Sequence, residues 1–337
     1  MFGSALAKYI GSPDRLAVER AVAELRAGRF VVLEEEGEGP LLVAAAENAD
    51  AALLRAMAAG GKTVALVLPQ ERLRHLGIEA ARAMALPAGT DPALLQDLLF
   101  AEKATPRATA RKAGAAELRA LELMLFTFLL PAVLAVPLER AEDAGLSVRV
   151  SGRAVAAFPD RAAQELREKA RASDPMIGSE DVEVVIFEGG CGLRDQIALV
   201  IGSPDPRRPV LVRMHSACLL GDLMGSLRCD CGQQLRDAVA EIAAVGGGIL
   251  LYLDQEGRGI GLRNKIRAYR LQSAGYDTVE ADSLLGYGPD QRRYEVAARM
   301  LDLLGYRSVI LMSNNREKRE ALEAFGVAVR EHAPVQE

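Results

Sequence analysis

Three cysteines in the second half of the chain are close enough in sequence to bind one metal ion. Cys218, Cys229 and Cys231 follow the spacing C-x10-C-x-C. Outside an oxidising compartment such clustering indicates a metal more than a disulfide, and zinc accepts thiolates readily. Three protein ligands would leave a fourth position for water, as in catalytic zinc sites, whereas His215 as a fourth ligand would close a structural site. The spacing leaves both arrangements open, together with a third in which the cysteines are unliganded core residues.

The composition is that of an ordinary globular protein. Hydrophobic residues make up 50% of the chain and charged residues 26%, as is usual in soluble globular proteins. The length of 337 residues, about twice that of a usual domain, predicts two domains. A net charge of −5 argues against nonspecific nucleic-acid binding, so a local basic cluster must hold any anionic ligand. The longest apolar run, 123–138, is interrupted by Pro131 and is too short to span a bilayer, and the N-terminus lacks a signal-peptide pattern. We expect a cytoplasmic protein with no membrane partner.

The segments that must position the cysteines alternate between strand and helix patterns. Apolar runs predict strands at 182–188, 196–202, 209–216, 248–257 and 308–312. Helical periodicity or length predicts helices at 237–245, 260–274, 291–304 and 316–325, with a loop at 283–288. This alternation predicts an α/β domain of α/β/α type, in which helices cover a mixed sheet. The cysteines follow the strand at 209–216, at the rim of that sheet.

The first half is predicted to form a separate α+β domain. It opens with a helix at 16–27 and a short strand at 30–33. The basic, Ala-rich stretch 101–120 shows little periodicity and is expected to be a mobile loop. The charged stretch 158–179 predicts a helix that ends near Ser173, and with it the domain boundary. We therefore expect domains at 1–175 and 181–337.

Four longer motifs occur in order between about 204 and 329: RMHSACLLGDLMGSLRCDCGQQL, LLYLDQEGRGIGLRNKIRAYRLQSAGYDTVEAD, LGYGPDQRRY and LMSNNREK. In order and spacing they resemble GTP cyclohydrolase II, the first committed enzyme of riboflavin synthesis. The resemblance implies that Cys218, Cys229 and Cys231 hold one catalytic zinc ion with an open position. Zinc would lower the pKa of its bound water towards about 7, and the resulting hydroxide would attack the imidazole-ring carbon of guanine. Ring opening and loss of formate follow.

The resemblance also implies a second cleavage that releases pyrophosphate and leaves 2,5-diamino-6-(5-phosphoribosylamino)pyrimidin-4(3H)-one. The matching residues are Arg292, proposed in the family to attack the α-phosphorus, and Asp290 as a base. Because the pKa of arginine exceeds about 12, stabilisation of transition-state charge is an adequate alternative to covalent attack. Without the resemblance, Asp290 and Arg292 would be a helix cap and a surface charge. Tyr269 matches a tyrosine that completes the reaction, and would otherwise be a half-buried helix residue.

A further set matches the family's nucleotide-contacting positions. They are Arg213, Met214, His215, Ser216, Gln234, Glu256, Gly257, Arg258, Thr278, Ser313 and Lys318. Arginine and lysine suit a triphosphate accompanied by Mg2+, glycines let backbone donors approach it, and a carboxylate such as Glu256 can accept from the guanine amine and ring nitrogen. In one departure from the family, Ala217 stands where a glutamate often precedes the first zinc cysteine.

In many members of this family a 3,4-dihydroxy-2-butanone 4-phosphate synthase domain precedes the cyclohydrolase. The segment FVVLEEEGEGPLLVAAAEN resembles a degenerate form of that synthase's opening strand and acidic loop. The synthase's Arg-Glu-Asn-Glu-Gly-Asp, Thr-Thr-Gly-Ile-Ser and Gly-His-Thr-Glu segments are missing, and the only histidine before residue 200 is His75. We predict a degenerate domain without synthase activity, which dimerises or positions its partner domain, and we expect a homodimer.

Three other functions stay open. The chain could be a noncatalytic nucleotide-sensing or assembly protein that retains the zinc fold. It could be a bifunctional riboflavin enzyme with a divergent synthase half. It could also be a related cyclohydrolase that stops after ring opening and releases no pyrophosphate, although Tyr269 argues against this last reading.

Overall fold

The structure is a computed structural model that describes residues 12–79, 83–87, 89–102, 109–145, 147–189, 195–313 and 315–333. By compactness the chain divides into two units, Met1–Phe158 with Arg263–Gln291, and Pro159–Leu262 with Arg292–Glu337. Each unit contains one mixed sheet, which confirms a two-domain α/β organisation. In the described part of the chain, no helix is both long and apolar enough to cross a membrane. Cys191 lies outside the described residues.

The sheet of the first unit has seven strands in the order β5-β4-β3-β6-β2-β1-β7. Its strands are β1 Val31–Glu34, β2 Leu41–Ala45, β3 Ala65–Val67, β4 Ala83–Ala85, β5 Ala110–Arg111, β6 Val133–Pro137 and β7 Val148–Ser151. Only the β1 and β7 pair is parallel among the pairings described. The predicted opening helix and strand are confirmed as α2 and β1.

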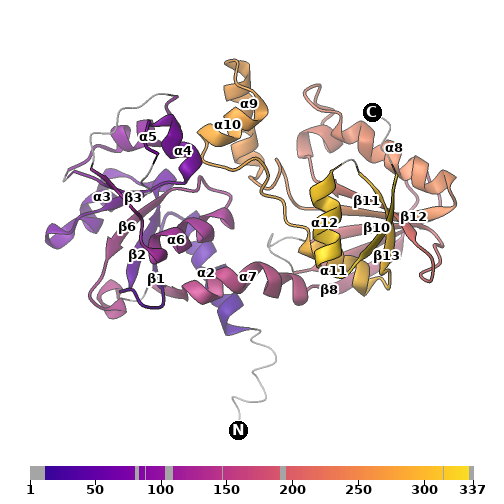
Figure 1. Cartoon of the computed structure of the whole chain (residues 1–337), viewed down its shortest axis with the longest axis horizontal. Helices are drawn as coiled ribbons and strands as arrows, with labels where there is room; N and C mark the ends of the chain where they lie inside the picture. The colour runs from indigo at the N-terminus through magenta and orange to yellow at the C-terminus, as the bar shows by residue number, and fades with distance from the viewer. Residues whose placement is uncertain are drawn as a thin grey trace, which may run out of the picture. The chain divides into compact units, whose positions relative to one another are not determined.

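Helices surround this first sheet. They are α2 Pro13–Arg26, α3 Ala51–Met57, α4 Gln70–His75, α5 Pro92–Phe100, α6 Ala115–Leu125 and α7 Gly152–Gln164, the last of which continues into the second unit, and a short 3-10 helix, η1, spans Ala46–Asn48. Two further helices, α9 Leu262–Ser273 and α10 Thr278–Leu284, come from the middle of the second half of the sequence but pack in the first unit. Figure 1 shows α10 beside α4.

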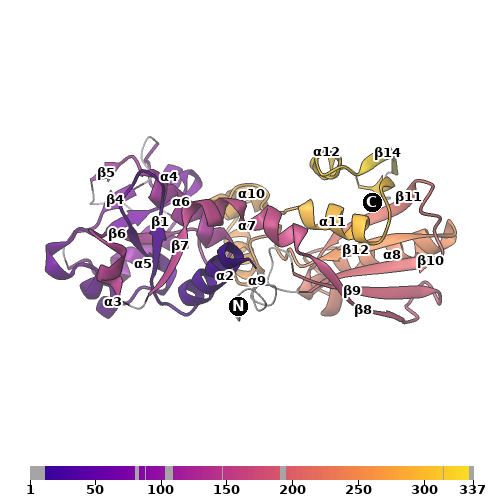
Figure 2. The ribbon, with the colours of Figure 1, turned by 90° about the horizontal axis from the view of Figure 1, so that it is seen from below.

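The sheet of the second unit also has seven strands, in the order β14-β13-β11-β12-β10-β9-β8. They are β8 Arg167–Ser173, β9 Val182–Glu188, β10 Gln196–Gly202, β11 Val210–Ser216, β12 Gly247–Leu253, β13 Ser308–Met312 and β14 Ala328–Ala333. The four strands from β14 to β12 run parallel, whereas β10, β9 and β8 continue the sheet in antiparallel pairs. Figure 2 shows β8 and β14 at opposite edges of this sheet.

Alternating side chains of the second sheet enter two different hydrophobic cores. Along β12, Ile249, Leu251 and Leu253 belong to one core and Leu250 to the other, as the period of a strand requires. Helix α8, Cys231–Ala244, covers the side that contains Leu250, while α11 Glu295–Leu303 and α12 Arg316–Ala324 cover the opposite side (Figure 1). The sheet therefore has helices on both faces.

Three local predictions are wrong. The charged stretch that begins at 158 is helical only up to Gln164, the end of α7, and Arg167–Ser173, also expected to be helical, form the edge strand β8, in which every residue is exposed. Pairing with β9 and an ion pair between Arg171 and Glu183 stabilise this strand, and neither can be recognised in the local pattern. The stretch expected to be a mobile loop contains α6 from Ala115 onward, although 103–108 lie outside the described residues. Helix α10 was not predicted, and it occupies the beginning of the expected loop 283–288.

Candidate functional site

The predicted site residues of the second unit gather where three parallel strands end. Strand β11 ends at Ser216, β12 at Leu253 and β13 at Met312, and β11 pairs in parallel with both of the others. The carboxyl ends of parallel strands meet at one edge of a sheet, which is where open α/β sheets bind ligands. This topology brings the segments that follow the three strands to the same edge.

The three cysteine sulfurs converge as a metal site requires. Their Sγ atoms lie within 4.8 Å of one another, and those of Cys218 and Cys229 are 3.6 Å apart. Two thiolates bound to one tetrahedral zinc ion at the usual bond length would be about 3.8 Å apart. Within the described ranges, no other histidine, cysteine or carboxylate joins this group. The triad therefore fits a metal ion with three protein ligands.

Two glycines make this convergence possible. The chain between Cys218 and Cys229 includes a π-helical turn, Leu219–Leu223, which contains Gly221. A Cβ atom on Gly221 would lie 2.8 Å from the sulfur of Cys229 and 2.9 Å from that of Cys218. A Cβ atom on Gly232 would lie only 2.2 Å from the carbonyl oxygen of Gly221. Any side chain at either position would push the turn away from the start of α8.

The electrostatics of the triad favour a bound cation. Burial raises the pKa of the Cys231 thiol, and the neighbouring sulfurs of Cys218 and Cys229 raise it further. Three thiolates this close cannot ionise together unless a positive charge offsets their repulsion. A divalent metal ion supplies that charge, so the donor set and its surroundings fit a thiolate-bound metal.

Asp222 connects the triad to the sheet. Its carboxylate accepts hydrogen bonds from the Cys218 N–H and the Tyr252 hydroxyl, both at 2.9 Å. The Nε2 atom of His215 lies 3.2 Å from the same carboxylate, and the His215 ring stacks on the Tyr252 ring at 5.6 Å. Burial raises the pKa of Asp222, but the hydrogen bond from His215 and the others outweigh burial and lower it overall. His215 is thus paired with Asp222 and is not a member of the metal-binding group, which speaks against the closed site.

Sequence reasoning missed Asp222, Tyr252, Gly221 and Gly232. His215 and Tyr252 are direct partners in the register of β11 and β12, so their stacking depends on pairing between strands that are distant in sequence. The position of Asp222, four residues after Cys218, was the available signal, because one turn brings such a side chain back to the starting N–H.

Several residues predicted to contact the nucleotide form a buried polar cluster beside the triad. The guanidinium of Arg213 donates to the side-chain oxygen of Gln234 at 2.9 Å and to the carbonyl of Met312 at 3.2 Å. Among the described residues, its Nε and the hydroxyl of Ser216 are buried without a hydrogen-bond partner. Burial lowers the pKa of Arg213 although nearby acidic groups act in the other direction. Such polar groups indicate a ligand site, because leaving them unpaired is costly.

Two more predicted residues are buried at the same edge. The amino group of Lys318, on α12, donates to the carbonyl of Met214 at 3.0 Å. The hydroxyl of Ser313, which follows β13, accepts from the N–H of Asn315 at 3.1 Å. Strand topology therefore joins Arg213, Met214, Ser313 and Lys318, as their predicted common role requires.

The glycine-rich turn after β12 has an unusual backbone. Gly257, Arg258 and Gly259 have φ values of 63°, 59° and 89°, and Arg258 is one of two non-glycine residues with positive φ in the described part of the chain. Glu256, just before this turn, accepts a hydrogen bond from the N–H of Leu219 at 2.7 Å. That bond ties the turn to the segment that carries the cysteines. The strained conformation of Arg258 is typical of functional loops.

The remaining predicted residues divide between the units. Tyr269 on α9, Thr278 at the start of α10, and Asp290 belong to the first unit, whereas Arg292 belongs to the second. Thr278 accepts a hydrogen bond from Gln272 at 3.3 Å, and the Lys265 amino group lies 5.7 Å from the centre of the Tyr269 ring. The roles of these residues stay predictions.

Comparison with known proteins identifies the family. The family model described as GTP cyclohydrolase II matches residues 168–334. A GTP cyclohydrolase-2 of Xylella fastidiosa (strain 9a5c) is 40% identical over 333 residues, which cover 96% of this chain and 83% of that protein. The chain belongs to the GTP cyclohydrolase II family. A GTP cyclohydrolase-2 of Azospirillum brasilense is similar over a comparable extent, with 38% identity over 94% of this chain and 88% of its own.

A further relative matches this GTP cyclohydrolase II family member over a shorter stretch, and a solved structure matches it at lower identity. The riboflavin biosynthesis protein RibBA of Bacillus subtilis is 53% identical over 144 residues, 42% of this chain and 36% of its own. The crystal structure of RibBX, a two-domain 3,4-dihydroxy-2-butanone 4-phosphate synthase from A. baumannii, matches 94% of this chain and 99% of its own at 17% identity. Its TM-score of 0.36 is too low to establish a shared fold. The synthase-like character of residues 1–175 therefore stays a prediction.

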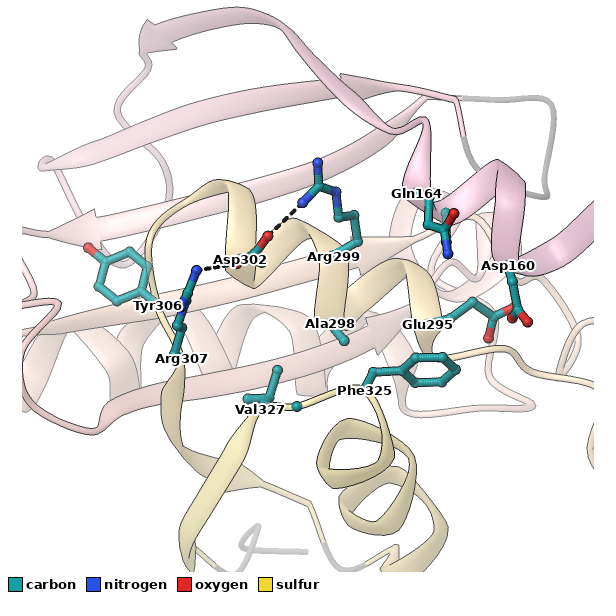
Figure 3. A pocket seen from close by; sticks show the side chains of 12 residues that line it. Asp160, Gln164, Glu295, Ala298, Arg299, Asp302, Tyr306, Arg307, Phe325 and Val327 are labelled. Carbon is teal, nitrogen blue, oxygen red and sulfur yellow. Dashed lines mark hydrogen bonds and ion pairs between the residues drawn. The ribbon is translucent and has the colours of Figure 1, made fainter. Parts of the chain in front are cut away.

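A separate pocket in this hydrolase lies between α11 and the turn after α12. Its cavity volume is about 360 Å³, and none of the predicted site residues lines it. Figure 3 shows Asp302 between Arg299 and Arg307, which donate to it at 2.5 and 3.2 Å. We assign it no part in the cyclohydrolase site.

Proposed function

We propose that the chain hydrolyses GTP to 2,5-diamino-6-(5-phosphoribosylamino)pyrimidin-4(3H)-one, formate and pyrophosphate, the first committed step of riboflavin synthesis. Membership of the GTP cyclohydrolase II family supports this reaction. The observation that carries it is the convergence of the Cys218, Cys229 and Cys231 sulfurs beside a buried polar cluster at the carboxyl edge of β11, β12 and β13.

The metal proposed for the triad is one zinc ion per chain. Three cysteine sulfurs within 4.8 Å of one another are a donor set that zinc accepts readily, and a site with three protein ligands would leave a fourth position for water, which suits catalysis. When bound, zinc supplies the Lewis acidity that activates a water molecule for attack on the guanine ring. The contacts of Asp222 with Cys218 and Tyr252 hold the first ligand in place for this purpose.

The protein's own residues bind and orient the nucleotide. Glu256 is proposed to accept from the guanine amine and ring nitrogen, since its carboxylate is held at the edge of the triad by the Leu219 N–H. Arg213 and Lys318 are proposed to bind the triphosphate with its Mg2+, because both are buried cations at that edge. The remaining nucleotide contacts proposed are Met214, His215, Ser216, Gln234, Gly257, Arg258, Thr278 and Ser313.

Pyrophosphate release is assigned to a second set of residues. Asp290 is proposed as the base and Arg292 as the residue that stabilises charge at the α-phosphorus, with Tyr269 completing the reaction after ring opening. A guanidinium suits charge stabilisation better than nucleophilic attack because it stays protonated.

A product assay tests the proposal. Purified full-length protein is given GTP and Mg2+, and formate, pyrophosphate and the diaminopyrimidine are measured together with zinc content. We expect both leaving groups, about one zinc per chain, and loss of zinc and products in Cys229→Ser. Zinc and nucleotide binding without products would support the noncatalytic sensing function. Formate without pyrophosphate would identify an enzyme that stops after ring opening.

Two further proposals concern the whole chain. We propose that it forms a homodimer, which light scattering of the purified protein tests. We also propose that it lacks synthase activity, so ribulose 5-phosphate should give no dihydroxybutanone phosphate. A positive result would make the protein a bifunctional riboflavin enzyme.

A further inference from the structure

A polar network fixes the segment 263–291 inside the first unit. Asn264 on α9 is completely buried, and its side-chain amide donates to the carbonyl of Phe128 at 3.0 Å and to the hydroxyl of Tyr287 at 2.9 Å. The Tyr287 hydroxyl donates in turn to the carbonyl of Leu129 at 2.7 Å. Burial raises the pKa of Tyr287, which keeps this hydroxyl a donor. The two ends of the segment thus bind to one loop of the first half.

Glu47, in η1, is the centre of a second group of contacts. Its side chain is 5% exposed, and one carboxylate oxygen accepts from Arg267 at 2.7 Å and from Arg263 at 3.1 Å. The other oxygen accepts from the N–H of Leu130 at 2.8 Å. Burial raises the pKa of Glu47, but the hydrogen bonds from Arg267 and Leu130 outweigh burial and lower it overall. The carboxylate therefore stays charged and holds two arginines of α9.

Arg72 on α4 attaches α10 in a similar way. Its buried guanidinium donates to the carbonyl of Leu284 at 3.1 Å and to three carbonyls at the end of α5: Leu98, Asp97 and Ala101. Burial lowers the pKa of Arg72 to about 10, which leaves it protonated at neutral pH. A cation at the carboxyl ends of two helices satisfies their free carbonyls. His75, at the end of α4, adds a contact of 3.1 Å between its Nε2 and the hydroxyl of Ser283.

The turn after α10 is also shaped to fit the first half. Gly286 has a φ of 86°, and a Cβ atom there would lie 2.8 Å from the ring of Pro69. Asn264 and Tyr287 are uncharged, and they make three hydrogen bonds that join the segment to the loop 128–130 or join the two residues to each other. These hydrogen bonds can form in only one position of the segment, because a shift of α9 would leave buried polar groups without partners.

We infer that the first half of the chain is a positioning scaffold for the segment 263–291, in which Glu47 is a positioning residue for α9. The segment contains Tyr269 and Asp290, to which the proposed function gives catalytic roles. The expected effect of the scaffold on catalysis therefore rests on the proposed function. Tyr269 lies two residues beyond Arg267 on the same helix, so an α9 released from Glu47 loses the fixed position of Tyr269. The scaffold thus gives a role to a domain without the segments of an active synthase.

The test uses full-length Glu47→Gln, which preserves the shape of the side chain and removes its charge. Hydrogen exchange in peptides from 263–291 should become about tenfold faster, because α9 loses a buried ionic contact. kcat for GTP should fall by about tenfold, with a smaller change in KM, because misplacement of a reacting group acts mainly on the chemical step. Zinc content should stay unchanged. The control Glu142→Gln removes the exposed ion pair with Arg149 and should alter neither exchange nor kcat.

A double-mutant cycle makes the test specific. Arg267→Gln removes the other side of the same contact, so the double variant Glu47→Gln with Arg267→Gln should exchange no faster than the more severe single variant. Additive effects, or unchanged exchange in Glu47→Gln, would overturn the inference. Hydrogen exchange is measured without turnover. If the wild type were inactive with GTP but the variants still showed these changes in exchange, the proposed function would be refuted and the scaffold role of the first half would still be supported.

Discussion

Asp222 accepts a hydrogen bond at 2.9 Å from the backbone N–H of Cys218, the first cysteine of the triad. The same carboxylate accepts from Tyr252 on β12, so one side chain fixes a proposed metal ligand against the sheet of the second unit. Asp222→Asn should therefore lower zinc affinity by about 10- to 100-fold, as loss of groups that orient metal ligands does. Competition with a chromogenic chelator measures it. Asp237→Asn, on the exposed face of α8, is the control, and equal affinities in the two variants would contradict the role of Asp222.

Gly221→Ala should abolish the metal site. The added methyl group would lie within 3 Å of two cysteine sulfurs, and the turn cannot move away without separating the ligands. We expect zinc content to fall well below one per chain and GTP turnover to be lost with it. Leu223→Ala, an exposed change in the same turn, should leave both unchanged. A Gly221→Ala protein with full zinc content would show that the triad tolerates a wider turn.

Arg213→Gln should weaken GTP binding. The buried guanidinium lies beside Gln234, where a positive charge in a region of low dielectric attracts phosphate strongly. We expect the KM for GTP to rise by about 10- to 100-fold, equivalent to losing one buried charged hydrogen bond. Arg236→Gln on the exposed face of α8 serves as the comparison. KM is measured by steady-state kinetics at several salt concentrations. If the rise in KM for Arg213→Gln disappeared at high salt, it would reflect only a screened surface charge.

Glu256→Gln should reduce discrimination between GTP and inosine triphosphate, which lacks the exocyclic amine. When the wild type binds inosine triphosphate, the carboxylate oxygen of Glu256 that would accept from the amine has no partner, which disfavours this nucleotide. We expect the ratio of kcat/KM for the two nucleotides to fall by about tenfold or more in the variant. A ratio that stays the same would remove Glu256 from guanine recognition.

The stability contributed by Glu47 should depend on pH. Its folded-state pKa lies below its ordinary value of 4.5, so the stabilisation is present above that value and is lost as the pH falls through the folded-state pKa. At neutral pH, Glu47→Gln should cost about 1 to 3 kcal/mol, and the difference from wild type should shrink in acid. Urea unfolding of both proteins between about pH 7 and pH 3 checks this sign. A constant difference would mean that the carboxylate charge is not what binds Arg267.

Local pattern predicted some of these elements and failed for others, for physical reasons. Helix α9 was expected at 260–274 and found at Leu262–Ser273, because its periodicity and limits are encoded locally. The exposed strand β8 has no apolar alternation, and its pairing with β9 alone makes it a strand. The triad followed from cysteine spacing, whereas the contact of Tyr252 with Asp222 depends on the register of two strands. Glu47 and Arg267, which are 220 positions apart, could not be paired from one sequence.

The path of the backbone restricts which fragments and chimeras of this protein keep their contacts intact. The chain passes from the first unit to the second within α7, returns to the first at Arg263, and enters the second again at Arg292. A chimera made by a single exchange point, or a fragment that starts at Asp181, would separate α9 and α10 from Glu47, Arg72 and the loop that binds Asn264. Modular exchange of the first half with that of a relative therefore requires two segments to be exchanged together.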